Sequence, residues 1–298
     1  MANAATMAEN PYHVRSISLP TRSHPLASTI EEELQKLRSS EAFTETTGVP
    51  SAAAISSGLC GLGEVYDSVA ALLLLPQTQQ ALAQNRNEKW VEELLDGSVK
   101  LVDMCDASRN VLLHMKEDAK ELHSALRRRK GDQESMECKI AHYLSSRKKL
   151  KKQINKHLAT LKKMEGNTAC PPLSDQDPHL QMAARFLQEV KSITASIFLS
   201  ILSFISSSPK SGKWNLISKL MRKGVVVTKG EQNTNEVESV DLALSSLQSH
   251  VAEIESVKQA QKQMEALEVR LDSLEGGIER VLRRLIQNRV SLLNILTQ

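Results

Sequence analysis

Apolar residues recur every three or four positions along most of this chain, which is the spacing of one face of an α-helix. The last segment is the most regular, and its repeat predicts a coiled-coil or helix-bundle seam. The seam comprises Val240, Leu244, Leu247, Val251 and Ile254, then a three-residue shift at Val257, then Ala260, Met264, Leu267, Leu271, Leu274, Ile278, Val281, Leu285, Asn288, Leu292 and Ile295. We expect it to pack against residues 88–165 or, in a homodimer, against itself. Gly276-Gly277 could instead break it into a helical hairpin.

The same periodicity predicts further helices upstream. A capping box at Ser28–Glu31 starts a short helix, and an apolar stripe from Leu59 ends at Pro76. Residues 88–129 and 134–165 form two long helices, of which the second has an apolar stripe interrupted by Arg147 and His157. Composition predicts a flexible tail over residues 1–27, a single helical-bundle domain over 28–298, and linkers near 44–57, 166–178, 206–213 and 224–236.

Residues 192–209 carry no charge and are long enough to span a membrane. Serines at Ser192, Ser196, Ser200, Ser203 and Ser207 dilute this apolar surface along one side. We interpret the segment as a buried central helix that is approached closely on its serine side. An isolated membrane helix is the alternative.

Composition supports the helical interpretation. The chain has 298 residues, 41% of them hydrophobic but only 3% aromatic, which suits helix packing better than a strand-rich sandwich. The predicted fold class is therefore all-α: an elongated helical bundle with a C-terminal coiled-coil-like helix or helical hairpin.

The cysteines and the N-terminus bear on the compartment. Four cysteines lie far apart without a CxxC pair, and the first residues lack the apolar run of a signal peptide, so we expect a cytoplasmic protein. The Ser- and Thr-rich first thirty residues leave an organelle transit peptide as the alternative.

Positive charge is concentrated in residues 127–163, which contain thirteen Lys or Arg and only three acidic residues. The whole chain has a net charge of only +3. The candidate basic face consists of Arg127, Arg128, Arg129, Lys148, Lys149, Lys151 and Lys152. Such a face could be solvated, pair with acidic helices, or bind anionic lipid. Tyr143 is its only aromatic neighbour, so nucleic acid is an unlikely partner.

The tail contains a candidate phosphorylation site. Arg15, Ser18 and Pro20 stand in the arrangement RSxSxP, which resembles a 14-3-3 docking motif. Phosphorylation of Ser18 would add an anionic group for the arginine cluster of such a partner. A chance match in a Ser-rich tail is the alternative.

Catalytic and cofactor motifs are not found in the sequence. Residues 58–63 contain three glycines without the GK[ST] ending of a P-loop, and we interpret them as a loop at a helix entry. Cys138 and His142 stand four apart on a predicted helix, but two ligands do not make a zinc site. We therefore expect no enzyme activity, no cofactor and no metal.

Several blocks together resemble one plant family, catalogued as domain of unknown function 241 and related to the BYPASS proteins. These blocks are HVRSISLP at 13–20, HPL at 24–26, LQKLRSSE at 34–41, LPQTQQAL at 75–82, KWVEELLDGS at 89–98, ELHSALRRRK at 121–130, YLSSRKKLKK at 143–152, SKLM at 218–221 and RRLIQNRVSLLNIL at 283–296. The resemblance implies no activity, substrate or catalytic residue. It does imply a link to root and shoot development, and some relatives are associated with chloroplasts or membranes.

Two functional hypotheses follow. The first is a non-enzymatic helical adaptor or scaffold that presents the basic face and the phosphorylatable tail to protein partners. The second is a peripheral membrane protein anchored by residues 193–205 and the basic helix.

Overall fold

The computed structural model describes residues 25–47, 51–128, 133–165, 178–207, 234–249 and 254–297. In these ranges the regular structure is entirely helical, so the all-α prediction is confirmed. The helices are α1 (Pro25–Thr47), α2 (Ala52–Leu74), α3 (Pro76–Gln84), α4 (Lys89–Arg128), α5 (Gln133–Glu165), α6 (Pro178–Ser206), α8 (Glu236–Ser249) and α9 (Ile254–Thr297).

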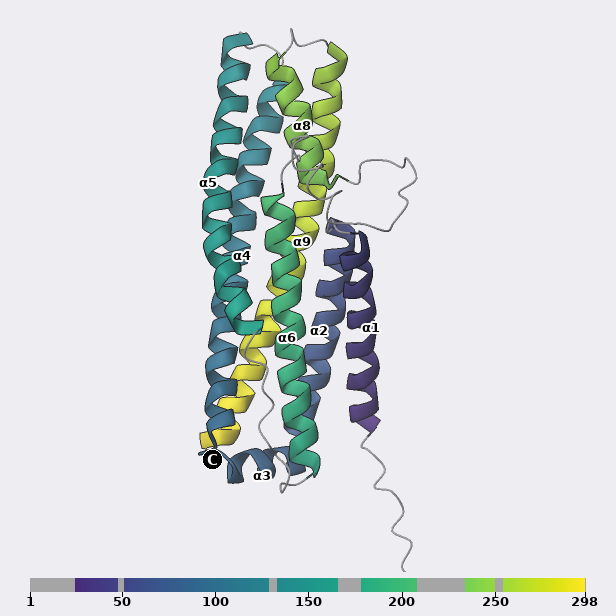
Figure 1. The fold of residues 1–298 in the computed structure, drawn as a ribbon, viewed down its shortest axis with the longest axis vertical. Helices are drawn as coiled ribbons and strands as arrows, with labels where there is room; N and C mark the ends of the chain where they lie inside the picture. The colour runs from purple at the N-terminus through teal and green to yellow at the C-terminus, as the bar shows by residue number, and fades with distance from the viewer. Residues whose placement is uncertain are drawn as a thin grey trace, which may run out of the picture.

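Two four-helix bundles are stacked along the long axis and share α4 and α9 (Figure 1). In the lower bundle, as drawn, α2 and α6 pack with these two helices, and in the upper bundle α5 and α8 do so. At 1.5 Å per residue, the 40 residues of α4 and the 44 of α9 extend over about 60 and 66 Å. The shared helices therefore join both bundles into one elongated molecule.

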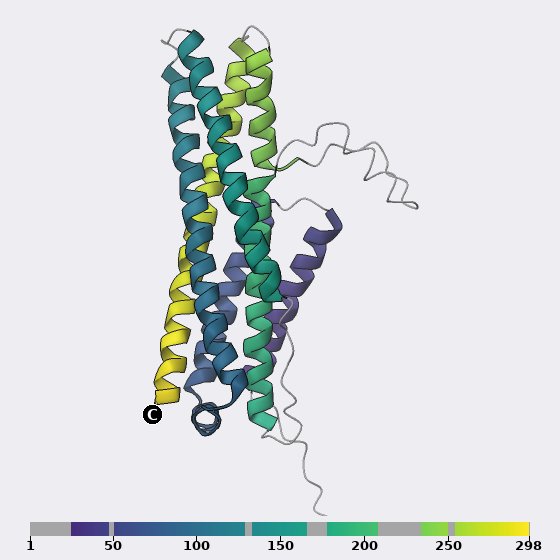
Figure 2. The same cartoon turned by 60° about the vertical axis from the view of Figure 1, so that its left-hand side comes forward.

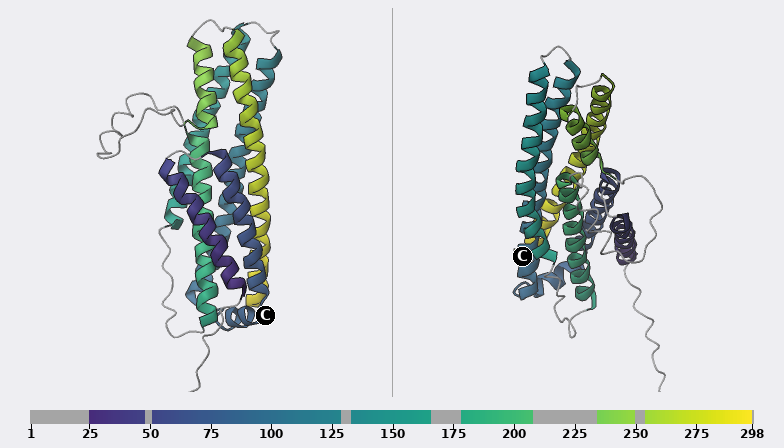
Figure 3. Two further views of the ribbon diagram at one scale, coloured as in Figure 1. Left: turned by 90° about the vertical axis from the view of Figure 1, so that its right-hand side faces the viewer. Right: turned by 45° about the horizontal axis from the view of Figure 1, so that its top comes forward.

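The remaining helices complete this arrangement. α8 continues upward from the place where α6 ends, and α5 packs beside both (Figure 1). α3 lies across the lower end of the molecule. α1 packs outside the bundle, where it crosses α2 and α6 obliquely (Figures 2 and 3).

The C-terminal seam is buried inside the chain. Every seam residue from Val257 to Ile295 is buried, and α9 packs against α2, α4 and α8. Ile254 departs from this pattern, because its position at the start of α9 leaves it 64% exposed. The seam thus packs intramolecularly, which is the first of the two predicted possibilities.

Residues 193–205 lie in the core. Ile193, Ile197, Phe198, Ile201 and Phe204 are all buried in α6, which packs against α2, α4 and α5. The serine side of the helix is only partly covered, and Ser203 is exposed. By length and composition, Ala52–Leu74 and His179–Ser206 could each cross a membrane, and 56% of each apolar stretch is buried in the bundle.

Three predicted helix boundaries were wrong. α1 begins at Pro25, where proline suits a first turn, and so Ser28 lies inside the helix. α2 begins at Ala52, capped by the Ser51 hydroxyl 3.2 Å from the Ala54 nitrogen, rather than near Leu59. The predicted loop at residues 58–63 is consequently part of α2. α1 also continues to Thr47, within the predicted linker at 44–57.

Of the two alternatives for the C-terminal segment, the continuous helix is the one observed, since α9 continues through Gly276 and Gly277 without a break. The chain reverses earlier, between Ser249 of α8 and Ile254 of α9, and these two helices pack together (Figure 1). A Cβ atom at Gly277 would lie 2.9 Å from Cδ1 of Leu59. Gly277 thus permits the close approach of α2 to α9 and does not interrupt the helix.

Candidate functional site

The basic residues of α5 divide between its surface and its interior. Lys148, Lys149, Lys152 and Lys156 are exposed along one side of the helix, and we call these four residues the lysine stripe. Their spacing of one, three and four residues keeps them on one helix face over about 12 Å. Within the described ranges none of the four has an ion-pair partner.

Lys151 does not belong to that surface, although the sequence placed it there. It is half-buried and lies near Arg147, Asp241 and Glu238. Burial lowers the pKa of its ammonium, and the charge of Arg147 lowers it further, against the opposite influence of the two carboxylates. The lysine stripe therefore includes Lys156 in place of Lys151.

The arginine part of the predicted basic face is separate from the lysine stripe. Arg127 and Arg128 are exposed at the end of α4, and Arg129 lies outside the described residues. Lys148 stands fifteen residues into α5, which corresponds to about 22 Å along the helix. The two clusters thus form no continuous basic face.

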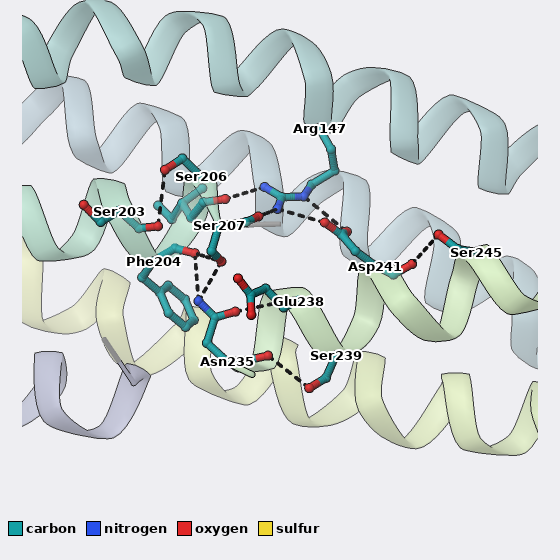
Figure 4. A network of polar contacts seen from close by, with 11 residues as sticks. Arg147, Ser203, Phe204, Ser206, Ser207, Asn235, Glu238, Ser239, Asp241 and Ser245 are labelled. Carbon is teal, nitrogen blue, oxygen red and sulfur yellow. Dashed lines mark hydrogen bonds and ion pairs between the residues drawn. The ribbon is translucent and has the colours of Figure 1, made fainter. Parts of the chain in front are cut away.

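Arg147 points toward the junction of the two bundles (Figure 4). Helical spacing places the lysine stripe on the other side of α5. Tyr143 and Leu150 are buried on the same side of α5 as Arg147, so helical spacing directs the guanidinium inward, and the residue is 3% exposed. Its Nε and Nη2 atoms donate to the Asp241 carboxylate of α8 at 3.4 and 3.1 Å. The ion pair therefore links α5 to α8 inside the protein.

The same guanidinium binds the C-terminal end of α6. Nη1 donates to the Ile205 carbonyl at 2.5 Å, and Nη2 donates to the Ser207 carbonyl at 2.9 Å. The last carbonyls of a helix have no partner within that helix, and a helix C-terminus carries partial negative charge. Arg147 thus satisfies the end of α6 with a positive group.

Asn235 completes this cluster from the start of α8. Its Oδ1 accepts a hydrogen bond from the Glu238 nitrogen at 2.9 Å, which is the geometry of an N-cap. Its Nδ2 donates to the Phe204 carbonyl at 3.3 Å and to the Ser207 hydroxyl at 2.6 Å. We call Arg147, Ser207, Asn235 and Asp241 the junction clamp, because they hold α5, α6 and α8 together (Figure 4).

A ladder of polar contacts fixes the register of α4 against α9. Arg109, Lys116 and His123 follow at seven-residue spacing on α4. Arg109 pairs with Glu279 at 3.0 Å, Lys116 with Asp272 at 2.6 Å and with Glu275, and His123 Nδ1 lies 2.9 Å from Glu268. The hydrogen bond from Arg109 lowers the pKa of Glu279, and the bonds to Asp272 and Glu275 raise the pKa of Lys116.

Sequence reasoning missed the junction clamp. The available signal was Arg147, a charge in the middle of an apolar stripe, since a buried charge requires a partner. Its partner Asp241 lies beside Val240 of the seam, but no sequence pattern connects it to α5. The tail residues Arg15, Ser18 and Pro20 lie outside the described residues.

The candidate metal pair gains no further ligand from the residues that the structure describes. Cys138 is exposed on α5, as is His142, and the residues that the structure describes contain no group of three or more His, Cys, Asp or Glu that could hold a metal ion. Cys105 is buried in α4, where burial raises the pKa of its thiol to about 12. Such a thiol is a poor nucleophile at neutral pH.

The comparisons with known proteins agree with the family resemblance. The family model described as Protein BPS1 matches residues 58–295, which run from within α2 to the last turn of α9 and exclude α1. No curated protein and no solved structure matches the chain. Because the match covers most of the chain, from the lower bundle through the junction clamp to the end of the seam, this protein belongs to the BPS1 family.

Proposed function

We propose that this protein is a non-enzymatic helical scaffold that binds an acidic protein partner through the lysine stripe. The observation that carries the proposal is the set of four exposed ammonium groups on one face of a rigid helix, without a carboxylate partner in the described part of the chain. Charges of one sign on a fixed surface attract a partner of opposite charge and orient it. On the strength of the family, we propose root and shoot development as the setting.

The surroundings of the lysine stripe favour a narrow acidic partner over a membrane. α4 lies directly beside α5, as the ion pair of Lys139 with Glu121 indicates. Along this part of α4, Asp106, Glu117 and Glu121 are exposed. Exposed carboxylates on the neighbouring helix disfavour a broad anionic surface, whereas an acidic helix could lie along α5 alone.

The second hypothesis, a membrane anchor through residues 193–205, receives less support. The apolar side chains of this segment form the core between α2, α4 and α5. Inserting them into a bilayer would require the lower bundle to open and lose that packing.

The predicted 14-3-3 motif around Ser18 would give the scaffold an additional, phosphorylation-dependent partner.

Proximity labelling in plant cells tests the proposal. The variant reverses the lysine stripe through Lys148→Glu, Lys149→Glu, Lys152→Glu and Lys156→Glu. The control makes the same charge change at exposed lysines on other helices, through Lys89→Glu, Lys120→Glu, Lys258→Glu and Lys262→Glu. We expect the stripe variant to lose at least about tenfold in labelling of acidic proteins, as fits the loss of several charge contacts, while the control labels them like the wild type.

Vesicles containing phosphatidylserine separate the two kinds of anionic partner. We expect the wild-type protein to leave these vesicles unbound at physiological salt. If the wild type and the control bound these vesicles and the stripe variant did not, the protein would act at a membrane surface and not as a scaffold. An unchanged set of labelled proteins in the stripe variant would contradict any role of the lysine stripe in partner binding.

A further inference from the structure

A small cavity lies within the lower bundle, where α2, α4, α6 and α9 meet. Its volume is about 60 Å³, and it is partly open to solvent. A water molecule takes about 30 Å³ in the liquid, so the cavity has room for a short aliphatic chain. Ligand sites in helical bundles are commonly built in this way, from side chains on facing helices of the core.

Aliphatic side chains form most of the cavity wall. They come from all four helices, and Val69, Leu101, Val190 and Leu292 are examples. Two cationic residues, Lys191 of α6 and Arg289 of α9, also line the cavity, together with neutral polar side chains and no acidic residue. An apolar wall combined with a net positive charge is complementary to a small anion with an apolar body.

Most polar residues of the wall have a hydrogen-bond partner within the described part of the protein, whereas Lys191 has none. The Tyr66 and Thr194 hydroxyls lie 2.8 Å apart, and Asn288 Nδ2 donates to the Tyr66 carbonyl at 2.9 Å. Arg289 Nη1 donates to the Leu95 carbonyl at 2.8 Å and to the Ser98 hydroxyl at 2.5 Å. Among the described residues, Lys191 has no hydrogen-bond or ion-pair partner.

Gly97 of α4 makes room for that lysine. A Cβ atom at this position would lie 3.1 Å from Cε and 3.2 Å from Nζ of Lys191. The lysine side chain thus lies against the backbone of α4, beside the cavity, instead of extending into solvent. Burial lowers the pKa of this ammonium, and nearby Lys100 lowers it further while Glu93 opposes the shift.

We propose that this cavity binds a small monocarboxylate, with its aliphatic chain among the core side chains and its carboxylate against the Lys191 ammonium. The carboxylate would supply the partner that Lys191 lacks, and the aliphatic chain would fill space that the packed core leaves empty. This binding site is independent of the lysine stripe, which lies on the outer face of α5. The site also gives a function to Gly97, a residue that otherwise weakens a long helix.

Ligand-observed NMR with the full-length protein and sodium butanoate tests the proposal. We expect butanoate to bind, and butanol and butylammonium, which have the same chain length, to bind at least about tenfold more weakly, because they lack the negative charge. Lys191→Met keeps the aliphatic stem and removes the charge, and it should weaken butanoate binding at least about tenfold. Lys100→Met, which removes a nearby exposed charge, should leave the binding within about twofold.

A chain-length series identifies the source of the carboxylate. From acetate through hexanoate to decanoate, affinity should rise until the chain fills the cavity and then stop rising, as a site of this volume requires. A continued increase to decanoate would instead indicate a groove for lipid acyl chains. Equal binding of butanol and butanoate, or unchanged binding by Lys191→Met, would overturn the carboxylate site and identify the cavity as a packing defect.

Discussion

At the scale of single residues, Arg147 shows how one charge organises the junction of the two bundles. A buried ion pair contributes little net stability, because desolvation of both charges offsets most of their attraction. It does impose geometry, since the guanidinium has to meet Asp241 and two carbonyls of α6 at once. The contacts of Arg147 thus fix how α5, α6 and α8 meet.

Removal of this arginine should be costly. Arg147→Met would leave the Asp241 carboxylate buried without its partner, and we expect a loss of about 3 to 5 kcal/mol in the free energy of unfolding. The double variant Arg147→Met with Asp241→Leu should recover most of that loss. Urea denaturation followed by circular dichroism measures both, with the exposed neighbour Lys148→Met as the control. A single variant within about 1 kcal/mol of the wild type would show that the junction clamp is not required for stability.

At the scale of helices, periodicity predicted which side of each helix is buried better than where each helix begins and ends. The buried positions of α9 are those that the repeat identified, because helical geometry alone decides which residues share a side. The junction clamp could not be found in this way, since Arg147 and Asp241 meet only through the packing of α5 against α8.

The glycine positions show why the ends were harder to predict. A glycine inside a helix lowers the stability of the helix by about 1 kcal/mol relative to alanine. For this reason the glycines suggested interruptions in both α2 and α9. At Gly61, however, a Cβ atom would lie 2.9 Å from Cδ2 of Leu37 in α1, and Gly277 is similarly close to Leu59. The close packing of two helices outweighs the stability that each glycine loses within its own helix. Such packing depends on a partner helix, which the sequence around the glycine does not identify.

The seam offers a matched pair of substitutions on one helix. Leu271→Asp would place an unpaired charge at a position that is 0% exposed and should cost about 3 kcal/mol or more. Val269→Asp makes nearly the same chemical change at a position that is 60% exposed and should cost less than about 0.5 kcal/mol. Thermal unfolding of the two variants measures the difference. If Leu271→Asp melted like the wild type, the seam would not be part of the core.

At the scale of the whole molecule, the shared helices couple the two bundles. α4 and α9 contribute buried faces to both, with Trp90 and Leu292 at one end and Leu126 and Ala260 at the other. Unfolding of either bundle alone would expose the apolar faces of helices that remain folded in the other. The cost of that exposure favours a single transition.

We therefore predict that the protein unfolds cooperatively in urea. Circular dichroism reports all helices, and the fluorescence of Trp90 reports the lower bundle once the second tryptophan is removed by Trp214→Phe. The two signals should change together with one midpoint. A loss of helicity that precedes the change in fluorescence would mean that the upper bundle unfolds independently.

The junction clamp has one more consequence, for protein engineering. Asn235 Nδ2 lies 2.6 Å from the Ser207 hydroxyl, so two residues that are 28 positions apart in the sequence touch in the structure. When two anchor points already touch, the number of residues joining them has little effect on closure entropy, and doubling it costs only about 0.6 kcal/mol. We therefore expect a reporter domain inserted between Ser207 and Asn235 to add little cost of closure, which would allow the protein to be followed in living tissue without a fusion at either end.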